Sequence, residues 1–102
     1  MNTAVSPHVS RATVGTARAS GYLQQLCKHF GHKVPVEFGP RQGRVEFPMG
    51  ICELEAPEGA EALSLRASAA TAEELARVEG VVASHLLRFA FREELKIDWE
   101  RA

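Results

Sequence analysis

The sequence predicts a small α+β domain in which two helices cover one face of a single antiparallel sheet. Two stretches carry apolar residues at helical spacing, and five short stretches alternate apolar with polar residues. Turn residues closely separate four of those strands, so the expected order is β-α-β-β-β-β-α. Hydrophobic residues make up 45% of the 102 and charged residues 25%, a composition typical of a globular chain with one core.

The N-terminal part of the chain is expected to supply a strand and a helix. Residues 1–8 show no periodic pattern and are expected to form a flexible tail before a single domain at 9–102. Alternation over 9–16 predicts the first strand. Thr16 is then expected to cap a helix over 17–30, because its hydroxyl can accept from the free amides of the first turn.

Four strands are expected after that helix, which Gly31 ends. Apolar and polar residues alternate at 34–38, 44–47, 52–55 and 63–67. Short turns containing proline and glycine join these stretches, a pattern that predicts an antiparallel meander.

The C-terminal part of the chain predicts the second helix. Thr71 and Glu74 form a capping box, and the apolar stripe that follows predicts a helix reaching about Glu94. Residues 95–99 alternate again, so the tail is expected to be extended and to offer one short C-terminal edge strand. The order of elements resembles that of the TATA-box-binding-protein-like folds, an analogy that carries no function.

Charge and composition exclude several classes of function. The net charge is −1 and charges of both signs are interspersed, so neither nucleic acid nor an anionic membrane is an expected partner. On the outer face of the predicted sheet, glutamates outnumber arginines, and cross-strand Arg–Glu pairs are expected there. No apolar stretch approaches the ~20 residues of a membrane helix. Without a secretory signal, Cys27 and Cys52 are expected to be reduced thiols in the cytoplasm.

One segment has chemical character, since it carries Cys27, His29 and His32, with His85 available from the second helix. Thiolates and imidazoles bind zinc, iron and haem iron, so these four residues are the candidate ligands. Cys27 and His29 lie about 200° apart around a regular helix, so both cannot face one ion. His29 can meet His32 at the helix end, and Cys27 can approach Cys52 or His85. The simpler interpretation is structural, with a core thiol and histidines beside a helix dipole.

Catalytic motifs are not found in the sequence. It contains neither a glycine-rich phosphate loop nor a Gly-x-Ser-x-Gly elbow, so the prediction leans away from an enzyme. Phe91 lies on the side of the second helix opposite its apolar stripe, and Trp99 follows in the tail. Both are candidate partner contacts, although packing of the tail on the helix explains them equally well.

Several blocks of the sequence together resemble a known bacterial family. Residues 22–29, 32–36, 43–48 and 84–93 are similar, in the right order, to the family called domain of unknown function 2218 (DUF2218). Some members are joined to flavin-dependent siderophore-interacting reductases, so the resemblance implies such a protein as a partner and a link to iron uptake. It implies no catalytic or binding residues.

Two hypotheses of function follow from the sequence. The first is a non-catalytic accessory module that docks onto a protein partner through Phe91 and Trp99. The second is a small metal- or haem-binding protein that uses His29 and His32 together with either Cys27 or His85. Convergence of those side chains in space separates the two, while folding itself requires no cofactor, because a chain of this length can bury its own core.

Overall fold

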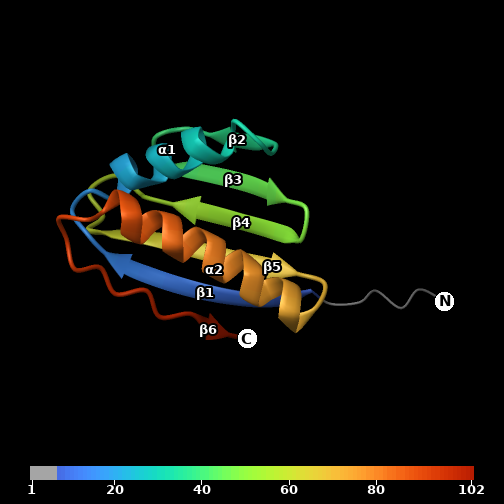
Figure 1. Ribbon diagram of the computed structural model, residues 1–102. Coiled ribbons are helices and arrows are strands. Elements are labelled where there is room, and N and C mark those ends of the chain that lie inside the picture. The colour runs from blue at the N-terminus through green and yellow to red at the C-terminus, as the bar shows by residue number, and fades with distance from the viewer. Residues whose placement is uncertain (1–6) are drawn as a thin grey trace.

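The computed structural model describes residues 7–102 and shows two helices lying on one face of a six-stranded sheet (Figure 1). Its elements in chain order are β1 (His8–Gly15), α1 (Ala19–Phe30), β2 (Val36–Phe38), β3 (Gln42–Phe47), β4 (Gly50–Glu55), β5 (Ala62–Ala69), α2 (Ala72–Phe89) and β6 (Glu100–Arg101). The fold class and the order of elements predicted from the sequence are confirmed.

The sheet is antiparallel throughout, with strand order β2-β3-β4-β5-β1-β6. The strands β2 to β5 form the expected meander, because each is joined to the next by a close turn. The first strand pairs with β5, which places the start of the domain beside its middle. Within residues 7–102, both helices lie on one face of the sheet and leave the opposite face without a helix (Figure 1).

The core lies between the helices and the inner face of the sheet. Strict alternation of buried and more exposed residues along β5 shows that one side of each strand faces the helices. The largest fully buried side chains are Leu23, Leu26, Leu54, Leu63, Leu65, Leu75 and Leu86. Within residues 7–102, neither helix combines the length and the apolar composition that crossing a bilayer requires.

Helix α1 begins later than the sequence predicts. The expected cap at Thr16 is wrong, since the residue before the first turn is Arg18 and no side chain caps this end. The Thr16 hydroxyl instead accepts from the Arg18 amide and donates to Glu93, 77 residues further along the chain. Thr16 therefore supports the turn before α1 and a long-range contact, and it does not cap the helix.

Helix α2 begins as predicted and ends earlier. The Thr71 hydroxyl accepts from the Glu74 amide at 3.1 Å, which confirms the cap. The helix ends at Phe89 and not near Glu94, because the chain turns over residues 90–93, where the Glu93 amide donates to Ala90. This turn directs the Glu93 side chain toward the start of α1.

The last residues run along the edge of the sheet next to β1 (Figure 1). The expected edge strand is present, although it forms at Glu100–Arg101 rather than at 95–99. The Arg101 guanidinium pairs with Glu79 of α2 at 3.0 Å and holds this segment in place. At the other end of the chain, β1 already begins at His8; residues 1–6 of the expected tail lie outside the described part.

Candidate functional site

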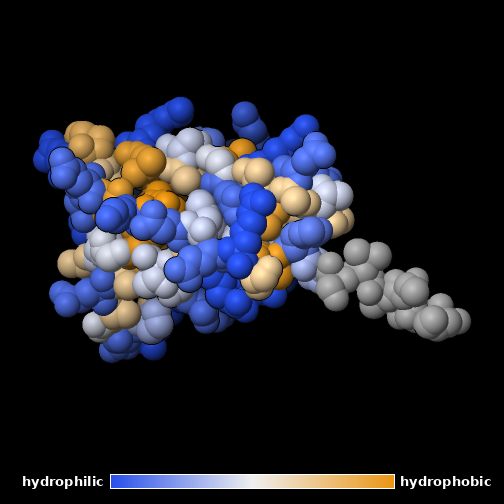
Figure 2. All heavy atoms as spheres, turned by 90° about the horizontal axis from the view of Figure 1, so that it is seen from below, coloured by the Kyte–Doolittle hydropathy of each residue, from blue (hydrophilic) through white to orange (hydrophobic). Residues whose placement is uncertain are grey.

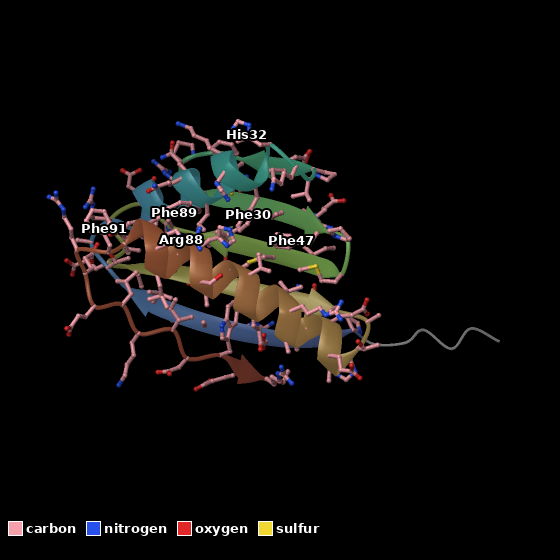
Figure 3. All side chains as sticks on the ribbon, in the orientation of Figure 1. Phe30, His32, Phe47, Arg88, Phe89 and Phe91 are labelled. Carbon is pink, nitrogen blue, oxygen red and sulfur yellow. The ribbon has the colours of Figure 1, made fainter. Side chains whose placement is uncertain are left out.

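Helices α1 and α2 meet through a group of five rings, here called the ring cluster. Its members are His29 and Phe30 of α1, Phe47 of β3, and His85 and Phe89 of α2. The centroids of His29 and His85 are 4.9 Å apart, and those of Phe30 and Phe47 are 5.0 Å apart and nearly perpendicular. Figure 3 shows Phe30 and Phe89 at the boundary between the two helices.

The two histidines of the ring cluster are held in different ways. The Nδ1 atom of His85 lies 2.7 Å from the Val81 carbonyl, so it carries the proton and leaves Nε2 as the atom with a free lone pair. Desolvation of the ring and the nearby His85 lower the pKa of His29, although His29 remains an exposed residue. The lowered pKa favours the neutral ring of His29, whose nitrogen lone pair is then available to a ligand.

Cys27 does not join the histidines. It is fully buried on the core side of α1, near Cys52 of β4. Burial raises the pKa of Cys27 to about 11 and that of Cys52 to about 12, so both are protonated at neutral pH. A protonated buried thiol is neither a nucleophile nor a metal ligand. Both thiols are free, as the sequence predicted.

His32 also lies apart from the pair. It follows Gly31 in the turn after α1, is exposed, and points away from α2 on the far side of α1 (Figure 3). Of the four candidate ligands, the structure brings together His29 and His85 only. Within residues 7–102, no group of three or more ligating side chains is placed to hold a metal ion.

A second candidate surface lies where α2 ends. Phe91 is 75% exposed and Leu87, four residues earlier, is 47% exposed. The Arg92 guanidinium lies 5.4 Å from the centre of the Phe91 ring, a cation–π contact. Figure 2 shows hydrophobic surface gathered toward this end of the molecule, and Figure 3 shows Phe91 pointing outward there. Trp99, the other residue predicted to contact a partner, is half-buried against the core.

Glu93 is a functional candidate that the sequence did not single out. Its carboxylate accepts from the hydroxyls of Thr16 and Tyr22, both of which are buried. The hydrogen bond to Glu93 and burial raise the pKa of Tyr22. These hydrogen bonds connect the turn after α2 to the start of α1. Because Phe91 belongs to the same turn, they also hold its backbone in place.

The third surface is the open face of the sheet. A groove of about 750 Å³ crosses it, lined by side chains from β1 to β5. The expected cross-strand Arg–Glu pairs are present: the Glu53 carboxylate lies 2.9 Å from Arg66 and 3.5 Å from Arg44. Phe38 is the large hydrophobic residue at its edge, 40% exposed.

The fold and these surfaces define a small α+β domain with one helix-covered face and one open face. The chain belongs to the family described as an uncharacterized protein conserved in bacteria, DUF2218, whose model matches residues 11–100. It is also similar to a protein solved by NMR, PA4090 from Pseudomonas aeruginosa. The two share 37% identity over 90% of this chain and 94% of the other, with a TM-score of 0.75. A comparison with curated protein sequences found no match.

Proposed function

We propose that this protein is a non-catalytic accessory module that docks onto another protein through the end of α2. The observation that carries the proposal is the exposure of Phe91 in the turn after α2, with Leu87 of the last helical turn also exposed. Apolar aromatic side chains of this kind, flanked by arginine, dominate the energy of protein interfaces. Here Arg92 lies against the Phe91 ring and the exposed Arg88 precedes it on α2.

The occupant that fits this surface is a protein carrying an apolar pocket with acidic residues around it. The two arginines supply the complementary charge, which raises the rate of association and orients the partner. The Glu93 carboxylate is turned inward to Thr16 and Tyr22, so it does not oppose an acidic partner. Because some members of the DUF2218 family are joined to siderophore-interacting reductases, we take such a reductase as the candidate partner. Both free thiols suit a reducing compartment, so we place this docking in the cytoplasm.

The docking proposal is tested with purified siderophore-interacting reductase from the same organism. We expect saturable binding by isothermal titration calorimetry, weakened at least tenfold in the double variant Leu87→Ser, Phe91→Ser. Phe38→Ser is the matched control, because Phe38 is also exposed but lines the open face of the sheet. Equal weakening by Phe38→Ser, or no binding by the wild type, would overturn the proposal. So would a wild-type dimer in sedimentation that Phe91→Ser abolishes, since a second copy would then be the occupant.

The His29–His85 pair favours a second candidate function, the binding of a divalent metal ion. Two imidazoles on neighbouring positions of a tetrahedral zinc ion need ring centroids about 5 Å apart, given metal–nitrogen bonds of about 2 Å. The observed 4.9 Å fits that requirement. Axial ligands on opposite sides of a haem iron need about 6 Å, so the pair favours a small ion over haem.

The metal candidate is tested by adding Zn²⁺ to the protein and following its melting temperature and histidine NMR signals. We expect a rise in melting temperature that His29→Ala and His85→Ala each abolish. His32→Ala is the control, because His32 lies apart on the far side of α1 and should leave the response intact. A response lost equally in His32→Ala, or preserved in His29→Ala, would exclude the pair as the site.

A further inference from the structure

The register of the sheet places one row of charged side chains across the open face. From one edge of the sheet to the other, the row consists of Glu37, Arg44, Glu53, Arg66, Arg11 and Glu100, each directly opposite the next. Opposite charges facing each other stabilise a sheet, whereas like charges directly opposite destabilise it. The row follows this rule at every step except one, where Arg11 of β1 faces Arg66 of β5.

The ion pairs on this face do not neutralise the two arginines. Arg66 shares the Glu53 carboxylate with Arg44, at 2.9 and 3.5 Å, and Arg44 pairs in addition with Glu46 at 3.6 Å. Among the described residues Arg11 forms no ion pair, although Glu100 lies opposite it on β6. The row as a whole carries three glutamates and three arginines, but its two adjacent arginines concentrate positive charge locally between β1 and β5.

Two hydroxyl groups lie next to the arginines. Thr13 and Ser64 face each other two positions further along β1 and β5, on the same side of the sheet as the arginines. Within the described chain, neither hydroxyl makes a side-chain hydrogen bond. Both residues line the groove of about 750 Å³ together with Arg11 and Arg66, a size in the range of small-molecule sites.

We propose that this groove binds a small molecule through a carboxylate or phosphate group held between Arg11 and Arg66. Guanidinium groups bind such oxyanions in a bidentate manner, and the Thr13 and Ser64 hydroxyls donate to the remaining oxygens. The like-charge pair is unfavourable in the free protein and becomes favourable once an anion lies between its members.

Acidic residues elsewhere in the groove limit the chemical class of the ligand. Glu37, Glu53 and Glu55 line the same groove, so a polyanion such as nucleic acid is repelled beyond its first charged group. Glu55 lies opposite Ser64 and makes no ion pair among the described residues, which leaves an acceptor for a hydroxyl or amino group. Glu55 and Thr13 lie two strands apart, about 10 Å. Glu55 lies one strand from Ser64, so the ligand class is a small organic acid or phosphate ester with a hydrogen-bond donor about 5–10 Å from its anionic group.

The test is an NMR titration with inorganic phosphate and, separately, with succinate at constant ionic strength. We expect saturable shifts at Arg11, Thr13, Ser64 and Arg66, and at least a tenfold loss of affinity in Arg11→Gln and in Arg66→Gln. A stronger response to one of the two probes assigns the anionic group. Arg41→Gln is the matched control, since it removes the same charge at a turn outside this groove, where Arg41 pairs with Glu58.

The like-charge pair supplies a second readout that does not depend on the probe. Without added anion, Arg11→Gln should raise the melting temperature, and it should abolish the further rise that phosphate gives the wild type. Shifts produced equally by chloride, loss of affinity in Arg41→Gln as large as in Arg11→Gln, or a lower melting temperature of anion-free Arg11→Gln would each overturn the proposal.

Discussion

Gly43 of β3 lies directly beneath Cys27 of α1. A Cβ atom at position 43 would be 2.6 Å from the Cys27 Sγ atom and 3.4 Å from the Leu23 side chain. The distance to Cys27 is shorter than any ordinary van der Waals contact, and the distance to Leu23 is at the lower limit of one. The helix therefore packs this closely onto the strand because residue 43 has no side chain. The contact also assigns Cys27 a packing role in the interface between α1 and the sheet.

This contact predicts that Gly43→Ala destabilises the protein by about 1–3 kcal/mol, the usual cost of overpacking a core. Cys27→Ala removes the Sγ atom that the new methyl group would meet. The double variant should therefore be more stable than the sum of the two single changes predicts. Urea unfolding of the four proteins measures this coupling.

Gly39→Ala is the control for that cycle, because a Cβ atom there has no neighbour within 4 Å. Its free energy of unfolding should stay close to the wild-type value. Strict additivity of Gly43→Ala and Cys27→Ala would show that the helix moves away from the strand instead of clashing with it.

The two thiols are predicted to resist modification in the folded protein. Burial raises the pKa of Cys27 to about 11 and that of Cys52 to about 12, and the thiolate is the reactive form. At pH 8, labelling with a disulfide reagent should be slow and should release two equivalents only when urea is added. Fast labelling of one equivalent in native buffer would contradict the packing role of Cys27.

The structure also explains which parts of the fold were predictable from sequence. Strands and helices follow from local periodicity, and the Thr71 cap depends on a residue only three positions away. The wrong cap at Thr16 and the early end of α2 lie at two places that Glu93 joins, because its carboxylate accepts hydrogen bonds from Thr16 and Tyr22. These partners are more than 70 positions apart in the chain, so no local pattern reports them.

The same distinction applies to the candidate site. Helical geometry correctly separated Cys27 from His29, because both lie on one helix. Which residue of α2 faces His29 depends on how the two helices pack, and periodicity does not contain that information. The arginine pair on the open face required the strand register, which places Arg11 opposite Arg66 although 55 positions separate them in the chain.

The lowered pKa of His29 predicts a loss of stability in mild acid. Desolvation by the neighbouring rings and the nearby positive groups lower the pKa of His29 below the 6.5 of an unfolded chain. The unfolded state therefore takes up the proton first as the pH falls, so stability is complete above pH 6.5 and decreases below it. The loss should level off once the pH is below the pKa of the folded state.

Urea unfolding at several values between pH 8 and pH 5 measures this dependence. His29→Gln cannot take up the proton and should give a flatter profile than the wild type over that range. Parallel profiles for the two proteins would show that His29 is not responsible.

Glu93 should control the ionisation of Tyr22. The hydrogen bond from the Tyr22 hydroxyl to the Glu93 carboxylate, together with burial, raises the pKa of Tyr22 above its ordinary 10.0. Tyr22 is the only tyrosine, so its absorbance near 295 nm on alkaline titration reports on this one group. Glu93→Gln removes the negative charge and should lower the pKa of Tyr22 toward 10.

Glu94→Gln serves as the control for that titration, since Glu94 is adjacent in the chain but exposed. It should leave the Tyr22 midpoint at the wild-type value, while circular dichroism at each pH checks that the fold persists. An unchanged midpoint in Glu93→Gln would mean that burial alone holds the proton on Tyr22. In that case contacts other than those of Glu93 with Thr16 and Tyr22 would have to hold the turn after α2 against α1.

If the midpoint falls as expected, Glu93→Gln should also make the turn that carries Phe91 open more often. Faster amide hydrogen exchange at residues 90–93 would detect this opening.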